Sequence, residues 1–287
     1  MRHPTKLYQY LQRAIGRRDA EGLSSSGAED WMALGLEAMR RLDYERALTC
    51  FDEAVAIVPT SHAAWYSRGM AFYHLGDDAA ALESFTRATQ YQPQSHLAWY
   101  GYGVTLAEMG RPEEALAALN KAIELQPDSH LAWLAKGLSL VGQQRWEEAL
   151  PILQAALERH PESAQAWYGL GIAHLHASHA AAALTAFESS IELQVDFDLA
   201  WYGKGLALLQ AARVEEALEA LIAATTANPQ CTLAWVRQAE TLEQLGRCDA
   251  ARAAYEQGLQ QTTAADPLHV QAQKQLQRLR LPRQGDR

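Results

Sequence analysis

Small, apolar and aromatic residues alternate with polar ones in a pattern that repeats every 34 residues along this chain. A tryptophan marks each copy, at Trp31, Trp65, Trp99, Trp133, Trp167, Trp201 and Trp235. A fixed period of about 20–50 residues is typical of stacked arrays, in which each unit buries the apolar face of its neighbour. Seven copies therefore predict a repeat architecture, and such arrays bind other molecules more often than they catalyse reactions.

Within each copy, small residues precede large ones at helical spacing. The fourth residue after each Trp is small: Gly35, Gly69, Gly103, Gly137, Gly171, Gly205 and Ala239. Alanine stands at the sixteenth, as Ala47, Ala81, Ala115, Ala149, Ala183, Ala217 and Ala251. The twentieth is large and apolar: Phe51, Phe85, Leu119, Leu153, Phe187, Leu221 and Tyr255. Residues four apart share one helix face, so each copy predicts two closely packed helices.

Residues typical of a helix end and of a helix start lie between the two helices of a copy. Gly76, Gly110 and Gly246 suit the left-handed conformation that ends a first helix. Pairs of glutamates follow, at 113–114, 147–148 and 215–216, in the first turn of the second helix, where the helix dipole favours acids. Adjacent carboxylates diverge on a helix, so we interpret these pairs as structural and not as acid–base catalysts.

The pattern resembles the tetratricopeptide repeat family. The residues that carry the resemblance are the Trp with its Gly or Ala four residues later, the central Ala, the large apolar residue and a closing Pro. That Pro is present as Pro59, Pro93, Pro127, Pro161 and Pro229, and is replaced by Val195 and Thr263. The resemblance covers roughly residues 28–265. It implies an all-α, right-handed superhelical solenoid of antiparallel helix pairs with a concave groove.

The predicted organisation has three parts. Residues 1–27 form a basic amphipathic helix and a flexible linker. Seven repeats follow, at 28–61, 62–95, 96–129, 130–163, 164–197, 198–231 and 232–265. Residues 266–287 form a capping helix and tail, because Leu268, Ala272, Leu276 and Leu279 recur at helical spacing and an open array requires a cover. The unbroken period favours one continuous solenoid over two domains.

Composition narrows the class further. The apolar fraction of 48% is ample for a core, yet no run approaches the roughly 20 apolar residues that span a bilayer. The first sixteen residues are polar and basic, which does not favour a secretory signal. Cys50, Cys231 and Cys248 show no C-x-x-C spacing, so neither a disulfide framework nor a zinc site is expected. We expect a cytoplasmic protein.

Charge is distributed unevenly along the chain. Residues 1–18 carry +5 and residues 266–287 carry +3, so a net charge of −9 leaves −17 for the residues between them. An acidic array disfavours nucleic-acid binding, which requires neutralisation of phosphates. The acidity either attracts a basic partner or keeps the array soluble, and we favour solubility.

The resemblance implies that the first helix of each pair lines the groove, at positions two before and one, five and eight after the Trp. Their spacing of three, four and three places them on one face. The candidate partner-binding residues at these positions are Tyr66, Met70, Tyr73, Leu97, Tyr100, Val104, Leu131, Leu134, Leu138, Tyr168, Ile172, Leu175, Leu199, Tyr202, Leu206 and Leu209. An exposed apolar strip of this length usually marks an interaction site. The competing interpretation is a tightly wound array whose groove residues pack on one another.

Other features refine this surface. Gly101, Gly169 and Gly203, two residues after their Trp, are expected to leave room for a ligand. The last copy is polar, with Arg237, Glu240 and Glu243. Family members that clamp a carboxylate place Lys at the first position after the Trp and Asn at the fifth. No copy here has either residue, so that mode of binding is rejected.

We consider three hypotheses for where the N-terminal segment lies. Leu7, Leu11 and Ile15 recur every four residues, with Lys6, Arg13 and Arg17 on the other face. The segment packs as a cap on the first repeat, folds back into the groove as a built-in ligand, or lies on an anionic membrane surface. A linker of about nine residues reaches about 15–18 Å, which covers the first repeats only.

Histidines and nucleophiles do not indicate catalysis. His62, His96 and His130 occupy one repeat position, each after a serine able to cap the helix, and stacked repeats separate them too far for a metal site. His174, His176 and His179 point apart on a helix, so we predict neither a metal nor a cofactor. His174 takes a position that is otherwise apolar. The sequence shows no nucleophile–base pair and no phosphate loop.

The leading prediction is a non-catalytic adaptor or assembly scaffold that binds an apolar or amphipathic helical segment of a partner protein. Alternatives are a membrane-associated assembly factor or chaperone docked through the N-terminal helix, and a carrier of an apolar small molecule. Self-association through the groove is a further alternative. No nucleic-acid partner is expected, and any contact with a membrane surface would be weak.

Overall fold

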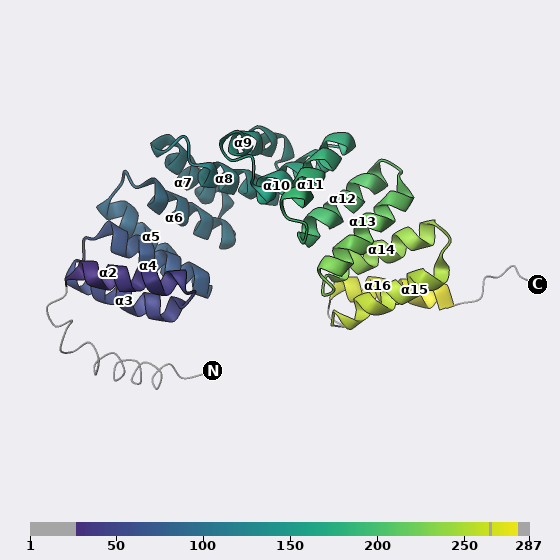
Figure 1. Cartoon of the computed structure of the whole chain (residues 1–287), viewed down its shortest axis with the longest axis horizontal. Helices are drawn as coiled ribbons and strands as arrows, with labels where there is room; N and C mark the ends of the chain where they lie inside the picture. The colour runs from purple at the N-terminus through teal and green to yellow at the C-terminus, as the bar shows by residue number, and fades with distance from the viewer. Residues whose placement is uncertain (1–26, 264–265, 281–287) are drawn as a thin grey trace, which may run out of the picture. The chain divides into compact units, whose positions relative to one another are not determined.

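The computed structural model describes residues 27–263 and 266–280, which form fifteen α-helices and no strand (Figure 1). The helices are α2 (Ala28–Arg40), α3 (Tyr44–Ile57), α4 (His62–Leu75), α5 (Asp78–Tyr91), α6 (His96–Glu108), α7 (Pro112–Leu125), α8 (His130–Gly142), α9 (Trp146–Arg159), α10 (Ala164–His176), α11 (Ala180–Leu193), α12 (Asp198–Gln210), α13 (Val214–Ala227), α14 (Thr232–Gln244), α15 (Cys248–Gln260) and α16 (Pro267–Arg280). The expected N-terminal helix lies outside these residues, as does its linker up to residue 26. None of the described helices combines the length and apolarity that crossing a bilayer requires.

The described residues form two compact units, which divide between Pro127 and Asp128. The first contains the helix pairs α2–α3, α4–α5 and α6–α7, and the second contains α8–α9, α10–α11, α12–α13 and α14–α15. Within each unit the second helix of a pair also packs on the first helix of the next pair, as α3 does on α4 and α11 on α12. The prediction of an all-α solenoid of seven helix pairs is confirmed. Continuity of the array across residues 127 and 128 stays a prediction.

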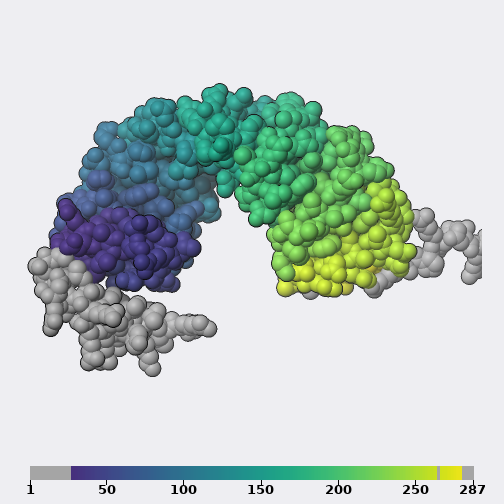
Figure 2. Space-filling view, viewed as in Figure 1, coloured from purple at the N-terminus to yellow at the C-terminus, as the bar shows by residue number. Residues whose placement is uncertain are grey.

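The predicted contact between small and large residues is present in both units. A Cβ atom added to Gly171 would lie 2.7 Å from a ring carbon of Phe187, and one added to Gly35 would lie 2.4 Å from Phe51. These large residues are fully buried. The missing side chain of glycine therefore allows the two helices of a pair to approach closely. In the space-filling view, the described residues of each unit form a continuous surface (Figure 2).

The prediction of free space at the glycines two residues after the Trp is wrong. A Cβ atom on Gly101 would lie 2.5 Å from Phe85, and one on Gly203 would lie 2.4 Å from Phe187. At Gly169 the nearest atoms belong to Leu138 and Leu153. The large residue of one pair thus lies between two first helices, its own and the next one, and it occupies the room that was expected for a ligand.

Every first helix ends in the same left-handed conformation. Gly76, Gly110 and Gly246 have φ angles of 75°, 69° and 72°, which confirms the predicted turn. The equivalent residues of the other four copies are not glycine but share the conformation: Leu42, Gln144, Ser178 and Ala212, with φ between 57° and 62°. Such a conformation costs a side-chain-bearing residue about 1–2 kcal/mol, so tertiary packing determines this turn more than local preference does.

The constant spacing of Trp and the closing residue has a structural cause. The indole Nε1 of Trp65 donates a hydrogen bond to the carbonyl oxygen of Pro59 at 2.8 Å, and Trp99, Trp167 and Trp235 repeat it. Trp201 donates in the same way to Val195 at 2.8 Å. Since the acceptor is a backbone carbonyl, the replacement of proline by Val195 keeps the contact between pairs.

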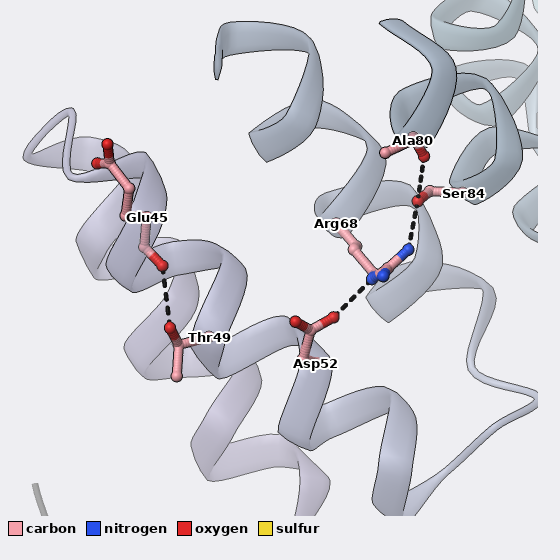
Figure 3. A network of polar contacts seen from close by, with 6 residues as sticks. All are labelled: Glu45, Thr49, Asp52, Arg68, Ala80 and Ser84. Carbon is pink, nitrogen blue, oxygen red and sulfur yellow. Dashed lines mark hydrogen bonds and ion pairs between the residues drawn. The ribbon is translucent and has the colours of Figure 1, made fainter. Parts of the chain in front are cut away.

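An ion pair joins neighbouring pairs in the first unit (Figure 3). Arg68 of α4 contacts Asp52 of α3 at 2.6 Å and donates to Ser84 of α5 at 2.9 Å. Its guanidinium also lies 4.7 Å from the ring centre of Phe72. The second unit repeats the ion pair at the equivalent positions with Lys204 and Glu188, 2.9 Å apart.

The glutamate pairs belong to the starts of the second helices, as predicted. Glu114, Glu148 and Glu216 each accept two hydrogen bonds from the arginine that precedes their helix. These bonds are the largest cause of the lowered pKa of all three carboxyl groups, and partial desolvation acts in the opposite direction. One member of each pair thus has a structural partner at the helix start.

Helix α16 confirms the predicted C-terminal cap. Ala272 and Leu276 are buried against α14 and α15, in a cluster that includes Leu242 and Tyr255. The outward residue Val270 is 58% exposed. A terminal helix of this kind covers an apolar face that would otherwise meet water.

His174 is a polar residue at a core position and gives the fold a predicted pH dependence. Leu106, Leu140, Leu208 and Leu242 occupy the equivalent position in other copies and are buried. The Nδ1 atom of His174 is buried without a hydrogen-bond partner among the described residues. Burial lowers the pKa of His174, the nearby His179 lowers it further, and Glu147 acts in the opposite direction.

We expect the free energy of unfolding of His174→Leu to fall less between pH 7 and pH 5 than that of the wild type. Because the folded state lowers the pKa of His174, the unfolded chain binds this proton more readily, and stability falls as the pH drops below the ordinary value of about 6.5. Urea unfolding at pH 8, 7, 6 and 5 measures the difference. At pH 8 the side chain at position 174 is uncharged in both proteins, so the difference between their free energies of unfolding at this pH reports the change in packing. An unchanged slope between pH 7 and 5 would contradict the prediction.

Candidate partner-binding surface

The candidate residues lie on the first helices of both units, and most of them remain partly exposed although they are apolar. The row two residues before the Trp is the most exposed: Leu97 is 40%, Leu131 42% and Leu199 42% exposed. The positions one, five and eight after the Trp are half-buried in Tyr66, Met70, Tyr73, Tyr100, Val104, Leu134, Leu138, Tyr168, Ile172, Tyr202, Leu206 and Leu209. Each unit therefore presents its own strip of apolar side chains.

Two candidates contribute to packing more than to an open surface. Leu175 is only 8% exposed and belongs to the core cluster around Phe187. Leu138 lies so close to Gly169 that a Cβ atom there would be 2.9 Å from its methyl carbon. Substituting either residue would change stability as well as binding, so neither is a clean probe of the surface.

Two further residues bear on this surface, and the sequence analysis did not single out the second of them. Leu36 lies at the fifth position after Trp31, where the spacing also predicts a groove residue, and it is 47% exposed. Phe197 stands where Ser61, Ser95 and Ser163 cap their helices, and its ring centre lies 5.1 Å from that of Tyr168. The break in the serine pattern was the available signal for Phe197.

The tyrosines combine buried rings with available hydroxyl groups. Burial raises the pKa of Tyr66, Tyr100 and Tyr168, so all three are neutral and able to donate a hydrogen bond near neutral pH. Among the described residues, none of these three hydroxyls has a hydrogen-bond partner. A bound segment can therefore use them as donors and acceptors beside apolar contacts.

The first unit places acidic groups near one of its tyrosines, Tyr73. Burial raises the pKa of Tyr73, and the charges of Glu108 and Asp78 raise it further, together with Tyr100. A positive charge on a ligand would be attracted by these carboxylates. The strip on this unit is thus apolar along its floor and acidic beside it.

The polar residues of the last copy are engaged within the protein. Glu240 accepts hydrogen bonds from Arg237 at 2.9 Å and from Gln271 of α16 at 2.8 Å. Glu243 accepts from Tyr255 at 2.8 Å and also pairs with Arg278 of α16. The polar face predicted at this end is present, and it holds the capping helix in place.

The histidines are distributed as single residues or pairs. His62 and His96 begin α4 and α6, and the serines before them cap these helices, whereas Ser129 makes no such bond before His130. The ring of His130 lies 4.6 Å from that of His160, a pairing the sequence did not indicate. In the described part of the chain, no group of three or more His, Cys, Asp or Glu side chains could hold a metal ion.

Comparison with known proteins agrees with this architecture. The model of the family described as "Tetratricopeptide repeat" matches residues 32–90, 79–130, 134–194 and 202–269. No curated protein matches the chain.

Several solved structures share the fold. YrrB, described as a TPR protein with an unusual peptide-binding site, is 24% identical, with a TM-score of 0.51 over 67% of this chain and 96% of its own. A tetratricopeptide repeat protein from Parabacteroides merdae is 16% identical, with a TM-score of 0.65 over 88% and 98%. PilW, a type IV pilus biogenesis factor, is 23% identical, with a TM-score of 0.64 over 69% and 92%. These identities establish similarity of fold alone.

The helix pairs, the Trp contacts and the family match over most of the sequence agree with one another. The chain belongs to the tetratricopeptide repeat family.

Proposed function

We propose that this protein is a non-catalytic adaptor or assembly scaffold whose first-helix strips bind an apolar or amphipathic helical segment of a partner protein. The observation that carries the proposal is the row of leucines before the Trp, which is about two fifths exposed in Leu97, Leu131 and Leu199. Recurrence of a large apolar side chain at the same exposed position in several copies favours an interaction surface over isolated exposure of single residues.

The family and its relatives support this proposal at a coarser level. Tetratricopeptide repeat proteins generally mediate protein–protein interaction and assembly, and they are typically non-catalytic. YrrB is described as having a peptide-binding site and PilW as a biogenesis factor, which are roles of binding and assembly. For this chain, the apolar character of the strips favours an apolar segment over a charged peptide end.

The expected affinity follows from the buried area. Covering four large apolar side chains gains about 6–12 kcal/mol before costs, at about 1.5–3 kcal/mol each. Association costs about 4–15 kcal/mol in lost freedom and ordering. The difference is compatible with binding in the micromolar range, which suits a reversible adaptor.

We expect the double variant Leu131→Asp, Leu199→Asp to lose partner proteins that the wild type captures from native lysate. Both leucines are the second residue of their helix, where the dipole favours an acid, so the charges should not disturb folding. Burying an unpaired carboxylate under a partner's apolar segment costs several kcal/mol, which converts micromolar binding to no detectable binding. Quantitative mass spectrometry of the captured proteins is the measurement.

The matched control is Val195→Asp, Ile222→Asp. These residues are 72% and 44% exposed and lie in the same unit, but outside the first helices. The control adds the same charge and should keep the wild-type partner list, and circular dichroism melts should agree for all three proteins. If the wild type and the Leu131, Leu199 variant capture identical partners, the binding site lies outside the first-helix strips.

A further inference from the structure

Helix α2, the first helix that the structure describes, has acidic residues beside Trp31 and Leu34 on the face that contacts a preceding pair in later copies. In the next two copies, the residue before the Trp is Ala64 or Ala98, both 0% exposed under the preceding pair, whereas α2 has the exposed Asp30 there. Six residues after the Trp, α2 has Glu37, which pairs with Arg40 at 2.6 Å and Arg41 at 2.8 Å. Charged residues on the outer face of a terminal repeat reduce its need for a cover. An apolar segment would meet Asp30 and Glu37 there as well as apolar side chains.

The strip of the first unit also offers apolar contacts. We define the first-unit strip as the side chains of Met32, Leu36, Tyr66, Met70, Tyr73, Leu97, Tyr100 and Val104. Leu36 is 47% exposed and Leu97 is 40% exposed. The carboxylates of Asp78 and Glu108 lie near enough to raise the pKa of Tyr73, after burial, which is the largest cause. The strip therefore matches a segment that is apolar on one side and basic on the other.

Charge distribution adds to this match. Residues 27–127 contain fourteen acidic and seven basic residues, a net charge of −7, whereas residues 1–18 carry five basic residues and no acid. Opposite net charges of this size favour association of the two parts of one chain.

Residues 1–26 lie outside the described part of the chain and join it at Gly27, directly before α2. Their sequence places Leu7, Leu11 and Ile15 four residues apart. The nine residues 19–27 span about 15–18 Å as a flexible linker. Because neighbouring helices pack about 8–10 Å apart, this length reaches the strip on α2 and α4 from Gly27.

We propose that residues 4–18 are a built-in ligand that occupies the first-unit strip until the segment of a partner displaces them. This proposal rests on the proposed function of the strips as binding sites for amphipathic segments. Tethering raises the local concentration of the segment to the millimolar range, so a contact of modest affinity suffices to occupy the strip. The protein then binds partners at its first unit only when their segments outcompete its own.

A labelled peptide with the sequence of residues 1–20 tests the proposal on the full-length chain. In the open variant, Leu7→Asp, Leu11→Asp, the chain's own segment loses its apolar face and the strip becomes free. We expect the open variant to bind the peptide about tenfold more tightly than the wild type, the shift produced when the tethered segment fills the strip about nine tenths of the time. Fluorescence anisotropy at low ionic strength gives both dissociation constants.

Two additions in the open background locate the site. Leu36→Asp, Met70→Asp should abolish binding of the peptide, because both side chains belong to the strip. Leu42→Asp is the matched control: this side chain is 70% exposed, lies outside the strip, and has a φ of 59°, which Asp tolerates. It should bind as the open variant does. Circular dichroism melts verify that each variant is folded.

Four results would overturn the proposal. Equal affinity of the wild type and the open variant would show that the segment does not occupy the strip, and so would absence of binding to the open variant. If the wild type, but not the open variant, then floats with phosphatidylserine vesicles, the segment binds a membrane. Binding that survives Leu36→Asp, Met70→Asp would place the segment elsewhere. A wild type that sediments as a dimer, when the open variant is a monomer, would make a second copy the occupant. The proposed function is tested separately, because Leu131 and Leu199 belong to the other unit.

Discussion

Replacing Phe187 with alanine is expected to lower the free energy of unfolding by about 3–5 kcal/mol, the usual cost of removing a buried aromatic ring. The ring is 0% exposed and lies between α10 and α12, where it fills the space left by Gly171 and Gly203. Its removal leaves a cavity bordered by two first helices at once. Urea unfolding measures the loss, and hydrogen exchange should locate it in α10, α11 and α12.

The same contact predicts that Gly203→Ala lowers the free energy of unfolding of the wild type but raises that of the Phe187→Ala variant. In the wild type the new Cβ would lie 2.4 Å from a ring carbon of Phe187, so overpacking should cost about 1–3 kcal/mol, offset in part by about 1 kcal/mol of helix propensity. In the Phe187→Ala background the ring is absent, so the same change should stabilise by up to about 1 kcal/mol. A double-mutant cycle isolates this coupling.

Gly142→Ala is the control for the cycle. Nothing lies within 4 Å of a Cβ atom at this position, and the residue belongs to helix α8. This substitution should be neutral or stabilising in the wild type and in the Phe187→Ala background alike. Strict additivity of Gly203→Ala with Phe187→Ala would contradict the assignment of Phe187 as the wedge between the helices.

The sequence alone predicted the helix pairs well because their determinants are local and repeated. A glycine four residues after the Trp and a large residue sixteen positions further recur in most copies, so their contact could be derived from helical periodicity. The second partner of Phe187 could not be derived in this way. Gly203 lies in the next repeat, and only the packing between pairs shows that the ring reaches it.

The left-handed turns illustrate a second limit. Gly76, Gly110 and Gly246 marked three of them, but Leu42, Gln144, Ser178 and Ala212 have no local preference for positive φ. Packing of the two helices sets their conformation, and a single copy read by itself would not reveal it. Comparison of the seven copies position by position would have done so.

The candidate surface was predictable in outline and less so in detail. The spacing of the first-helix residues placed Leu131, Leu199 and their equivalents on one face, and their exposure agrees with that placement. The burial of Leu175 was not predictable from spacing, since its neighbours in the core come from other helices. Whether the face binds a partner remains a proposal that the variants above test.

Loss of the capping helix is the second large effect that we expect. Leu276 is 5% exposed and packs in a cluster with Leu242, Val236 and Tyr255. Leu276→Asp removes this apolar contact, for about 2–5 kcal/mol, and places a carboxylate where no cation among the described cluster residues could pair with it. Detaching α16 relieves the unpaired charge, so we expect the helix to leave the array instead of remaining docked.

Detachment should be visible beyond α16, because this helix also holds polar groups in place. Glu240 would lose Gln271 and Glu243 would lose Arg278, and the cluster around Tyr255 would meet water. We therefore expect hydrogen exchange to lose all protection in α16 and part of it in α14 and α15, with α10 and α11 unchanged. Val270→Asp places the same charge on the same helix at a residue that is 58% exposed, and it should keep wild-type protection. Equal exchange in both variants would show that α16 contributes little to the last repeat, which would then need another source of cover for its apolar face.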